Sequence, residues 1–292
     1  IYKVQKYFKL IDDAGDIVSL PRGFLQALVC FLKENNIAYT IRFNTPSFEQ
    51  TPYQSQIELT PAQIPIVQTA TECDQGVIVA PSGSGKTIIG LETIARRQLP
   101  ALILVHRKQL LDQWVERIQT FLGIAKTHIG QYSGMKKRLG KQITVGLLQS
   151  LARKGDLSEL KDQFGTIIVD ECHHIPAATF REVIAQLNPK YIYGLTATPK
   201  RKHNDEKLIY VYIGEIIARM EASDIAPVSN LPSQPPEVLI RTTALAVPFK
   251  FTTDHFQLLA KVVCFDTARN QLIVEDILSK ISDGKRLLVL SE

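Results

Sequence analysis

The chain has 292 residues, 45% of them hydrophobic and 22% charged, which is the composition of an ordinary globular protein with room for two domains. No apolar run approaches the roughly 20 residues that a membrane helix needs, and no signal peptide is visible. The net charge of +5 is modest, and the four cysteines form no C-x-x-C pair. The cysteines argue against a disulfide framework or a zinc ribbon and predict a reducing compartment, either the cytoplasm or a eukaryotic nucleus.

Residues 1–45 are predicted to form a small accessory unit of mixed α and β structure. Residues 2–11 have the pattern of a strand, and residues 17–20 are expected to pair back with it as a hairpin. Pro21 is expected to open a helix with one apolar face, and residues 38–43 predict a third strand. The unit carries no catalytic constellation, so its role stays open between substrate binding and packing.

Residues 46–60 are predicted to be a linker because they are polar and contain two prolines. Residues 61–220 begin with a short helix and then alternate apolar strands with amphipathic helices. Trp114 recurs with apolar residues at helical spacing, so we expect it in the core rather than stacked on a base. The strands are near-continuous apolar runs over 77–80, 101–105, 143–147, 166–169 and 191–195. Such runs are typical of a parallel sheet in an α/β fold, which binds its ligands at the carboxyl ends of the strands.

A glycine-rich turn between the first of these strands and the next helix has the pattern of a phosphate-binding loop. Gly83 and Gly85 allow successive backbone N–H groups to face phosphate oxygens, and the following helix adds the positive end of its dipole. Lys86 is placed to reach the β and γ phosphates of ATP, and the Thr87 hydroxyl is placed to bind Mg²⁺. The alternative is a chance glycine turn. The candidate ATP-binding residues of the loop are Pro81, Ser82, Gly83, Ser84, Gly85, Lys86 and Thr87.

A second motif follows at residues 167–174, where an apolar strand ends in two acids. Asp170 is a candidate to hold the Mg²⁺ of a bound nucleotide, and Glu171 is the candidate general base for the attacking water. A metal site built from Cys172, His173 and His174 is the competing interpretation. We disfavour it because consecutive residues do not easily face one ion.

Residues 117–154 contain no Asp or Glu and hold eight basic residues. An acid-free basic block of this kind suits a nucleic-acid backbone, although a solvated basic surface is the alternative.

With both motifs present, the chain resembles superfamily-two helicases and translocases. Residues 170–173 read D-E-C-H, close to the D-E-A-H form of that superfamily, and the loop opens with Ala80 in a form typical of helicases. More closely, the chain resembles the XPB-like group of double-strand translocases and related bacterial and phage proteins, including type III restriction subunits. Further matches lie at residues 102–114, 144–151 and 194–199, and the ordered set covers about residues 57–217.

The resemblance implies a RecA-like domain and roles for further residues. His173 would couple the nucleotide site to Thr196 and Thr198. Gln63 would recognise adenine, although related proteins usually carry an Arg and a Tyr just before this glutamine, where this chain has Thr60 and Ala62. The candidate nucleic-acid contacts are Arg107, Gln149 and Ser150.

Residues 221–243 are predicted to be a second linker, and residues 244–292 the beginning of a second RecA-like domain, with a helix near 269–281 and a strand over 286–290. The chain begins with Ile1 and stops within that strand, so we expect sequence to be missing there. The arginines that such a domain supplies to the nucleotide are absent before Glu292. Because such an arginine contributes on the order of 10³-fold or more in rate, this stretch alone is expected to bind ATP and hydrolyse it weakly.

The resemblance thus implies an ATP-dependent helicase or translocase acting on nucleic acid, DNA more than RNA, with ATP and Mg²⁺ as cofactors. The alternatives are the motor subunit of a restriction or phage-defence system, an RNA-remodelling helicase, and a binding module that ATP switches without hydrolysis.

Overall fold

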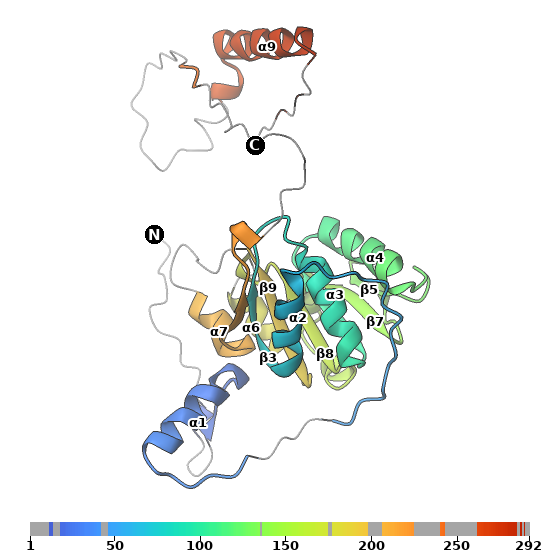
Figure 1. Cartoon of the computed structure of the whole chain (residues 1–292), viewed down its shortest axis with the longest axis vertical. Helices are drawn as coiled ribbons and strands as arrows, with labels where there is room; N and C mark the ends of the chain where they lie inside the picture. The colour runs from blue at the N-terminus through green and yellow to red at the C-terminus, as the bar shows by residue number, and fades with distance from the viewer. Residues whose placement is uncertain are drawn as a thin grey trace. The chain divides into compact units, whose positions relative to one another are not determined.

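The computed structural model (Figure 1) divides the chain into two units, residues 1–228 and 229–292, which are considered separately. The residues that it describes are 12–13, 18–41, 46–134, 136–174, 177–197, 206–224, 240–242, 262–284, 287 and 289.

The first unit is built on an eight-stranded sheet in the order β10-β3-β9-β8-β4-β7-β5-β6. Its strands are β3 (Gln75–Val79), β4 (Ala101–Val105), β5 (Gly130–Ser133), β6 (Lys136–Arg138), β7 (Ile143–Leu147), β8 (Thr166–Asp170), β9 (Tyr191–Thr196) and β10 (Ile216–Arg219). All neighbours pair in parallel except β6, which runs antiparallel to β5. The five predicted strands are confirmed. Three further strands, β5, β6 and β10, were not predicted; they lie toward the sheet edges and lack long apolar runs.

Helices cover both faces of this sheet. One core cluster joins the sheet to α2 (Gln63–Glu72), α3 (Lys86–Arg97) and α4 (Lys108–Leu122). The other joins the opposite face to α5 (Leu148–Lys154), α6 (Ala177–Ile184) and α7 (Glu206–Ile213). Buried side chains on both faces explain the near-continuous apolar strands. The expected α/β architecture is therefore present, with α2 beside α3 in Figure 1.

The segment 46–60 has no helix or strand, as its prolines predict, yet hydrogen bonds attach it to the first unit. Thr51 N–H donates to the Gln98 carbonyl at 2.8 Å, and Gln56 N–H donates to the Phe121 carbonyl at 2.8 Å. Tyr53 packs against the core, and its hydroxyl lies 2.7 Å from the Gln142 carbonyl. The segment is therefore a strap along the first unit.

Near the N-terminus, β1 (Asp12–Asp13) pairs antiparallel with β2 (Val18–Ser19). The second strand of this short hairpin lies within the predicted 17–20, whereas the first lies after the predicted strand 2–11. After it come a short 3₁₀ helix, η1 (Arg22–Phe24), and α1 (Leu25–Glu34). The predicted third strand is wrong over residues 38–41, which form no strand, and the rest of it lies outside the described residues, as do residues 2–11. Arg22 ties η1 to the sheet because its Nε donates to Gln75 Oε1 at 2.7 Å.

In the second unit, α9 (Thr267–Ser282) confirms the predicted helix, and its N-cap residue Asp266 accepts a hydrogen bond from Ala268 N–H. Of the predicted strand over 286–290, only residues 287 and 289 are described, without strand structure, and most of the predicted linker 221–243 lies outside the described residues. Within the described part of the chain, no helix is long and apolar enough to cross a membrane.

Candidate nucleotide site

The two motifs lie at the carboxyl ends of nearby strands. The glycine-rich loop follows β3, Asp170 ends β8 and Glu171 follows it, and β9 lies between these strands with Thr196 at its end. Ala80 N–H donates to the Thr196 carbonyl at 2.9 Å, which joins the start of the loop to β9. Local patterns indicated each motif, but the strand order brings them together at the edge where an α/β sheet binds ligands.

The loop has the backbone that its glycines predict. Gly83 and Gly85 both have φ of +82°, in the left-handed region that favours glycine, and α3 begins directly after Gly85. Ser84 is buried and its Oγ has no hydrogen-bond partner among the described residues. Lys86 starts the helix, and its Nζ lies 3.4 Å from the Ala80 carbonyl. The loop therefore presents a helix N-terminus and a lysine at the sheet edge.

Gln63 lies against this loop. Its Nε2 donates to the Ser84 carbonyl at 2.9 Å, and its Oε1 accepts from Thr60 N–H at 3.0 Å. The side chain is buried between these bonds. In this structure Gln63 thus fastens the start of α2 to the glycine-rich loop.

We expect Gly85→Ala to weaken ATP binding more than Gly83→Ala. Both substitutions strain a left-handed residue, at about 1–2 kcal/mol. A Cβ at residue 85 would also lie 2.5 Å from Gln63 Nε2, whereas one at residue 83 meets nothing within 4 Å. The extra methyl must displace Gln63, whose hydrogen bonds contribute about 1 kcal/mol each. Calorimetric titration with Mg-ATP, beside thermal unfolding, measures both effects, and equal losses in the two variants would contradict the role given to Gln63.

Asp170 ends β8 and is buried, with both carboxylate oxygens engaged. Trp114 Nε1–H donates to its Oδ2 at 2.7 Å, and Glu171 N–H donates to its Oδ1 at 3.0 Å. Burial raises the pKa of Asp170, and the Trp114 hydrogen bond opposes that rise by favouring the ionised form. Because burial disfavours the charged form of Asp170, a nearby cation would stabilise it, and a carboxylate is a suitable ligand for a hard cation.

Glu171 has a φ of +45°, which is unusual for a residue with a side chain and is the kind of strain found at functional sites. Its Oε1 lies 3.4 Å from Lys86 Nζ, which links the two motifs directly. Its Oε2 is buried without a hydrogen-bond partner among the described residues and lies 3.4 Å from His173 Nδ1. The carboxylate therefore has an oxygen available to a molecule bound at this edge.

His173 lies in the 3₁₀ turn η3 (Cys172–His174), and its Nδ1 is 2.7 Å from Thr196 Oγ1. A line of polar contacts thus runs from Lys86 through Glu171 and His173 to the end of β9. Thr198 lies outside the described residues. Cys172, the first residue of η3, is buried in the core. No cluster of three His, Cys, Asp or Glu suited to a metal occurs in the described part of the chain.

The candidate nucleic-acid residues are farther along the same edge. Arg107 is exposed at the start of α4, after β4. Gln149 and Ser150 begin α5, after β7, and Ser150 Oγ accepts a hydrogen bond from Gly134 N–H at 3.1 Å. Ser150 therefore fastens the turn between β5 and β6.

Part of the basic block at residues 117–154 forms β6, the edge strand of this hairpin. The β6 residues Lys136, Lys137 and Arg138 are exposed. Arg138 also donates to the Ile129 carbonyl at 2.6 Å, so it has a structural task as well. The block is thus partly a solvated surface and partly a support for the hairpin.

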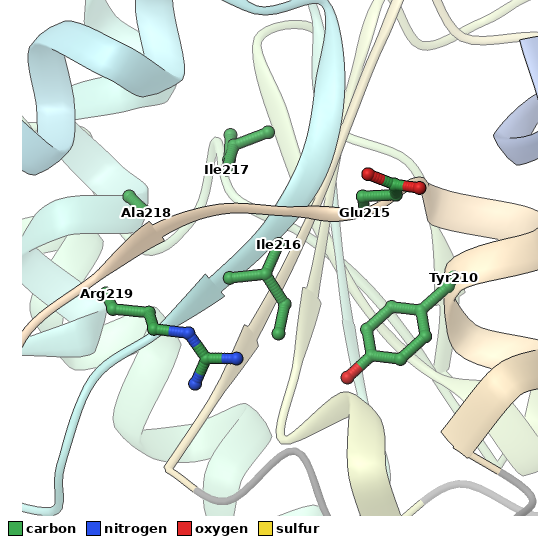
Figure 2. Close-up of a pocket in the computed structure, with 6 residues that line it drawn as sticks. All are labelled: Tyr210, Glu215, Ile216, Ile217, Ala218 and Arg219. Atoms are coloured by element: carbon green, nitrogen blue, oxygen red, sulfur yellow. The ribbon is translucent and has the colours of Figure 1, made fainter. Parts of the chain in front are cut away.

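Two features were absent from the sequence analysis. Trp114 was expected in the core, and it is 1% exposed, but its hydrogen bond to Asp170 has no sequence signal because the two residues lie 56 positions apart. The other feature is a pocket of about 500 Å³ beside β10, shown in Figure 2, where Ile216 and Ile217 point to opposite sides of the strand. Tyr210 of α7 and residues 215–219 line it, and none belongs to the nucleotide site.

Comparison with known families identifies the group to which this architecture belongs. The family described as type III restriction enzyme, res subunit, matches residues 49–201, which include both motifs. The chain belongs to this family. This membership confirms the resemblance drawn from the motifs.

Named relatives of the chain share the same region. It is 31% identical over 207 residues to the putative DNA 3'-5' helicase Rad25 of Halobacterium salinarum, covering 69% of this chain and 32% of the relative. It is 33% identical over 174 residues to the DNA 3'-5' translocase XPB2 of Sulfurisphaera tokodaii, covering 59% and 38%. The chain thus spans well under half of the length of these relatives.

A solved structure confirms the fold. The UvsW helicase from bacteriophage T4 superposes with a TM-score of 0.58 at 18% sequence identity, covering 72% of this chain and 82% of that one. At this identity the likeness speaks for the RecA-like α/β fold alone.

Proposed function

We propose that residues 61–220 form the first motor domain of an ATP-dependent DNA helicase or translocase. The observation that carries the proposal is the approach of Lys86 Nζ to Glu171 Oε1, at 3.4 Å, in a family member. It joins a phosphate-binding lysine and a candidate base at one sheet edge. The two archaeal relatives described above are named for DNA, and a further relative, of Acanthamoeba polyphaga mimivirus, is named a putative ATP-dependent RNA helicase. We place DNA before RNA because the family is that of a DNA-restriction enzyme subunit. The proposed second motor domain begins near residue 244, and residues 1–45 are an accessory unit.

The residues present fit magnesium as the cofactor of ATP. Asp170 is a buried carboxylate, and Thr87 follows Lys86 at the start of α3. These two side chains would hold the ion, which would supply neutralising charge to the phosphate oxygens.

The protein side chains would perform the remaining steps. Lys86, paired with Glu171 in this structure, would turn to the phosphate groups of the nucleotide. Glu171 would then be free to orient water and accept its proton at a carboxylate oxygen. His173 contacts both Glu171 and Thr196, so it would transmit a change at Glu171 to the end of β9. From β9 the change would reach the residues that contact nucleic acid. Arg107 and Gln149 would contact the nucleic-acid backbone.

Steady-state ATP hydrolysis tests this proposal when it is measured on a protein that includes the entire proposed second motor domain, without nucleic acid and with duplex DNA, single-stranded DNA or RNA. We expect the greatest stimulation by duplex DNA. Stimulation by RNA alone would replace the DNA assignment with RNA remodelling. ATP binding without hydrolysis under every condition would overturn the motor in favour of an ATP-switched binding module.

A second candidate is the motor subunit of a restriction system, which the family's own description favours. In that case translocation would serve a nuclease. Incubating the whole protein with long duplex DNA and ATP separates the two, because only a restriction enzyme would cut the DNA.

A further inference from the structure

Trp114 is the only tryptophan of the chain, and its ring is buried between helix α4 and the sheet. The indole N–H points at Asp170 and donates to Oδ2 at 2.7 Å. Burying an indole without a partner for its N–H is unfavourable, so this bond satisfies the tryptophan. It also places a donor on the carboxylate that ends β8.

Each oxygen of the Asp170 carboxylate accepts one hydrogen bond. Trp114 occupies Oδ2 and the backbone N–H of Glu171 occupies Oδ1. Two donors on different oxygens fix the rotation of the carboxylate plane. An ionised carboxylate has about four acceptor positions, so it keeps acceptor capacity for a cation. The two hydrogen bonds therefore orient the Asp170 carboxylate and leave acceptor positions on it for a cation.

Helix α3 is shaped to admit the ring. Gly90 lies in the interior of α3, where glycine costs roughly 1 kcal/mol relative to alanine. A Cβ at that residue would lie 3.0 Å from the Trp114 ring atom Cη2 and 3.1 Å from Leu195 Cδ1. A side chain there would press on the indole and shift its N–H. The missing Cβ thus makes room for the bond to Asp170.

We propose that Trp114 is a positioning residue that holds Asp170 in the orientation needed for the magnesium of the bound nucleotide. The proposal rests on the proposed function, because it assigns to Trp114 a task toward that ion. Side chains that orient metal ligands typically change metal affinity by about 10- to 100-fold when they are removed. A tryptophan that served the core alone would affect folding stability and leave the use of magnesium unchanged.

The test compares the affinity for a fluorescent ATP analogue, mant-ATP, with Mg²⁺ and with EDTA, in the natural chain and in Trp114→Phe. Phenylalanine keeps an aromatic ring and removes the N–H. We expect the variant to need about 10- to 100-fold more Mg²⁺ for the same nucleotide affinity, with its affinity in EDTA unchanged. Anisotropy of the mant group measures both without relying on hydrolysis.

Ile118→Ala is the matched control because Ile118 lies one turn along α4, is fully buried and belongs to the same core cluster. We expect it to lower stability in urea while leaving the Mg²⁺ requirement unchanged. If Trp114→Phe does not fold, the single tryptophan can be replaced by 3-benzothienylalanine, which has the shape of tryptophan with sulfur in place of the N–H.

The outcomes separate the two proposals. An unchanged Mg²⁺ requirement, or an equal loss of affinity in Mg²⁺ and EDTA, would overturn the role of Trp114 while the nucleotide site stands. If the natural chain bound mant-ATP with no dependence on Mg²⁺, the magnesium site of the proposed function would fail, and the role of Trp114 with it.

Discussion

Replacing Glu171 with glutamine is expected to lower the rate constant of ATP hydrolysis by about 10²- to 10⁴-fold, the usual contribution of a positioned general base. Glutamine has nearly the same shape but cannot accept the proton of the attacking water. The substitution also removes the negative charge that lies 3.4 Å from Lys86 Nζ and 3.4 Å from His173 Nδ1. Single-turnover hydrolysis of radiolabelled Mg-ATP measures the effect even in a slow enzyme, and Mg-ATP binding should persist.

Glu159→Gln is the control for Glu171→Gln, since Glu159 pairs with Lys154 outside the nucleotide site and is largely exposed. Its rate should match that of the natural chain. If Glu171→Gln hydrolysed ATP at the natural rate, Glu171 would not be the base, and the contact with Lys86 would be structural.

Replacing Lys86 with alanine is expected to weaken Mg-ATP binding by about 10- to 100-fold. Hydrogen bonds to charged groups contribute about 1.5–3 kcal/mol, and each 1.4 kcal/mol corresponds to a factor of ten in affinity. The side chain is 11% exposed and is poised at the start of α3, beside the loop that would hold the phosphates. Isothermal titration with Mg-ATP and with Mg-ADP gives the loss and shows which phosphate the lysine serves.

The control for Lys86→Ala is Lys108→Ala, because Lys108 is an exposed lysine at the start of α4 that pairs with Asp112. Its removal deletes the same charge and leaves the loop intact, so nucleotide affinity should not change. Unaltered Mg-ATP affinity in Lys86→Ala would contradict the phosphate-loop assignment itself.

The pairing of Lys86 with Glu171 gives these two predictions a common basis. Lys86 Nζ lies 3.4 Å from the Glu171 carboxylate, so a residue that follows β3 pairs with one that follows β8. A phosphate at the loop would compete for the same lysine. Phosphate binding and release of the base are therefore expected to be linked. Lys86→Ala releases the base without a phosphate, so any fall in its hydrolysis rate should come from the lost contact between the lysine and the phosphates.

The five central strands, the glycine-rich turn and the position of the two acids could be predicted from the sequence. Each is written in a short stretch of chain. Strands covered on both faces require unbroken apolar runs, a left-handed turn requires glycines such as Gly83 and Gly85, and acids placed directly after a buried strand appear at its carboxyl end. The edge strands β6 and β10, and β5 next to β6, lack long apolar runs of this kind, so the sequence did not predict them.

Contacts between residues far apart in the chain could be seen only in the folded protein. Gln63 reaches the Ser84 carbonyl, His173 reaches Thr196, and Trp114 reaches Asp170, because the order β3-β9-β8-β4 brings separate segments to one edge. The tertiary structure also turned the expected linker 46–60 into a strap along the first unit. Hydrogen bonds between distant positions produce no periodic pattern and no compositional bias in the local sequence. The side chains that surround the candidate catalytic groups therefore became visible only when the chain was folded.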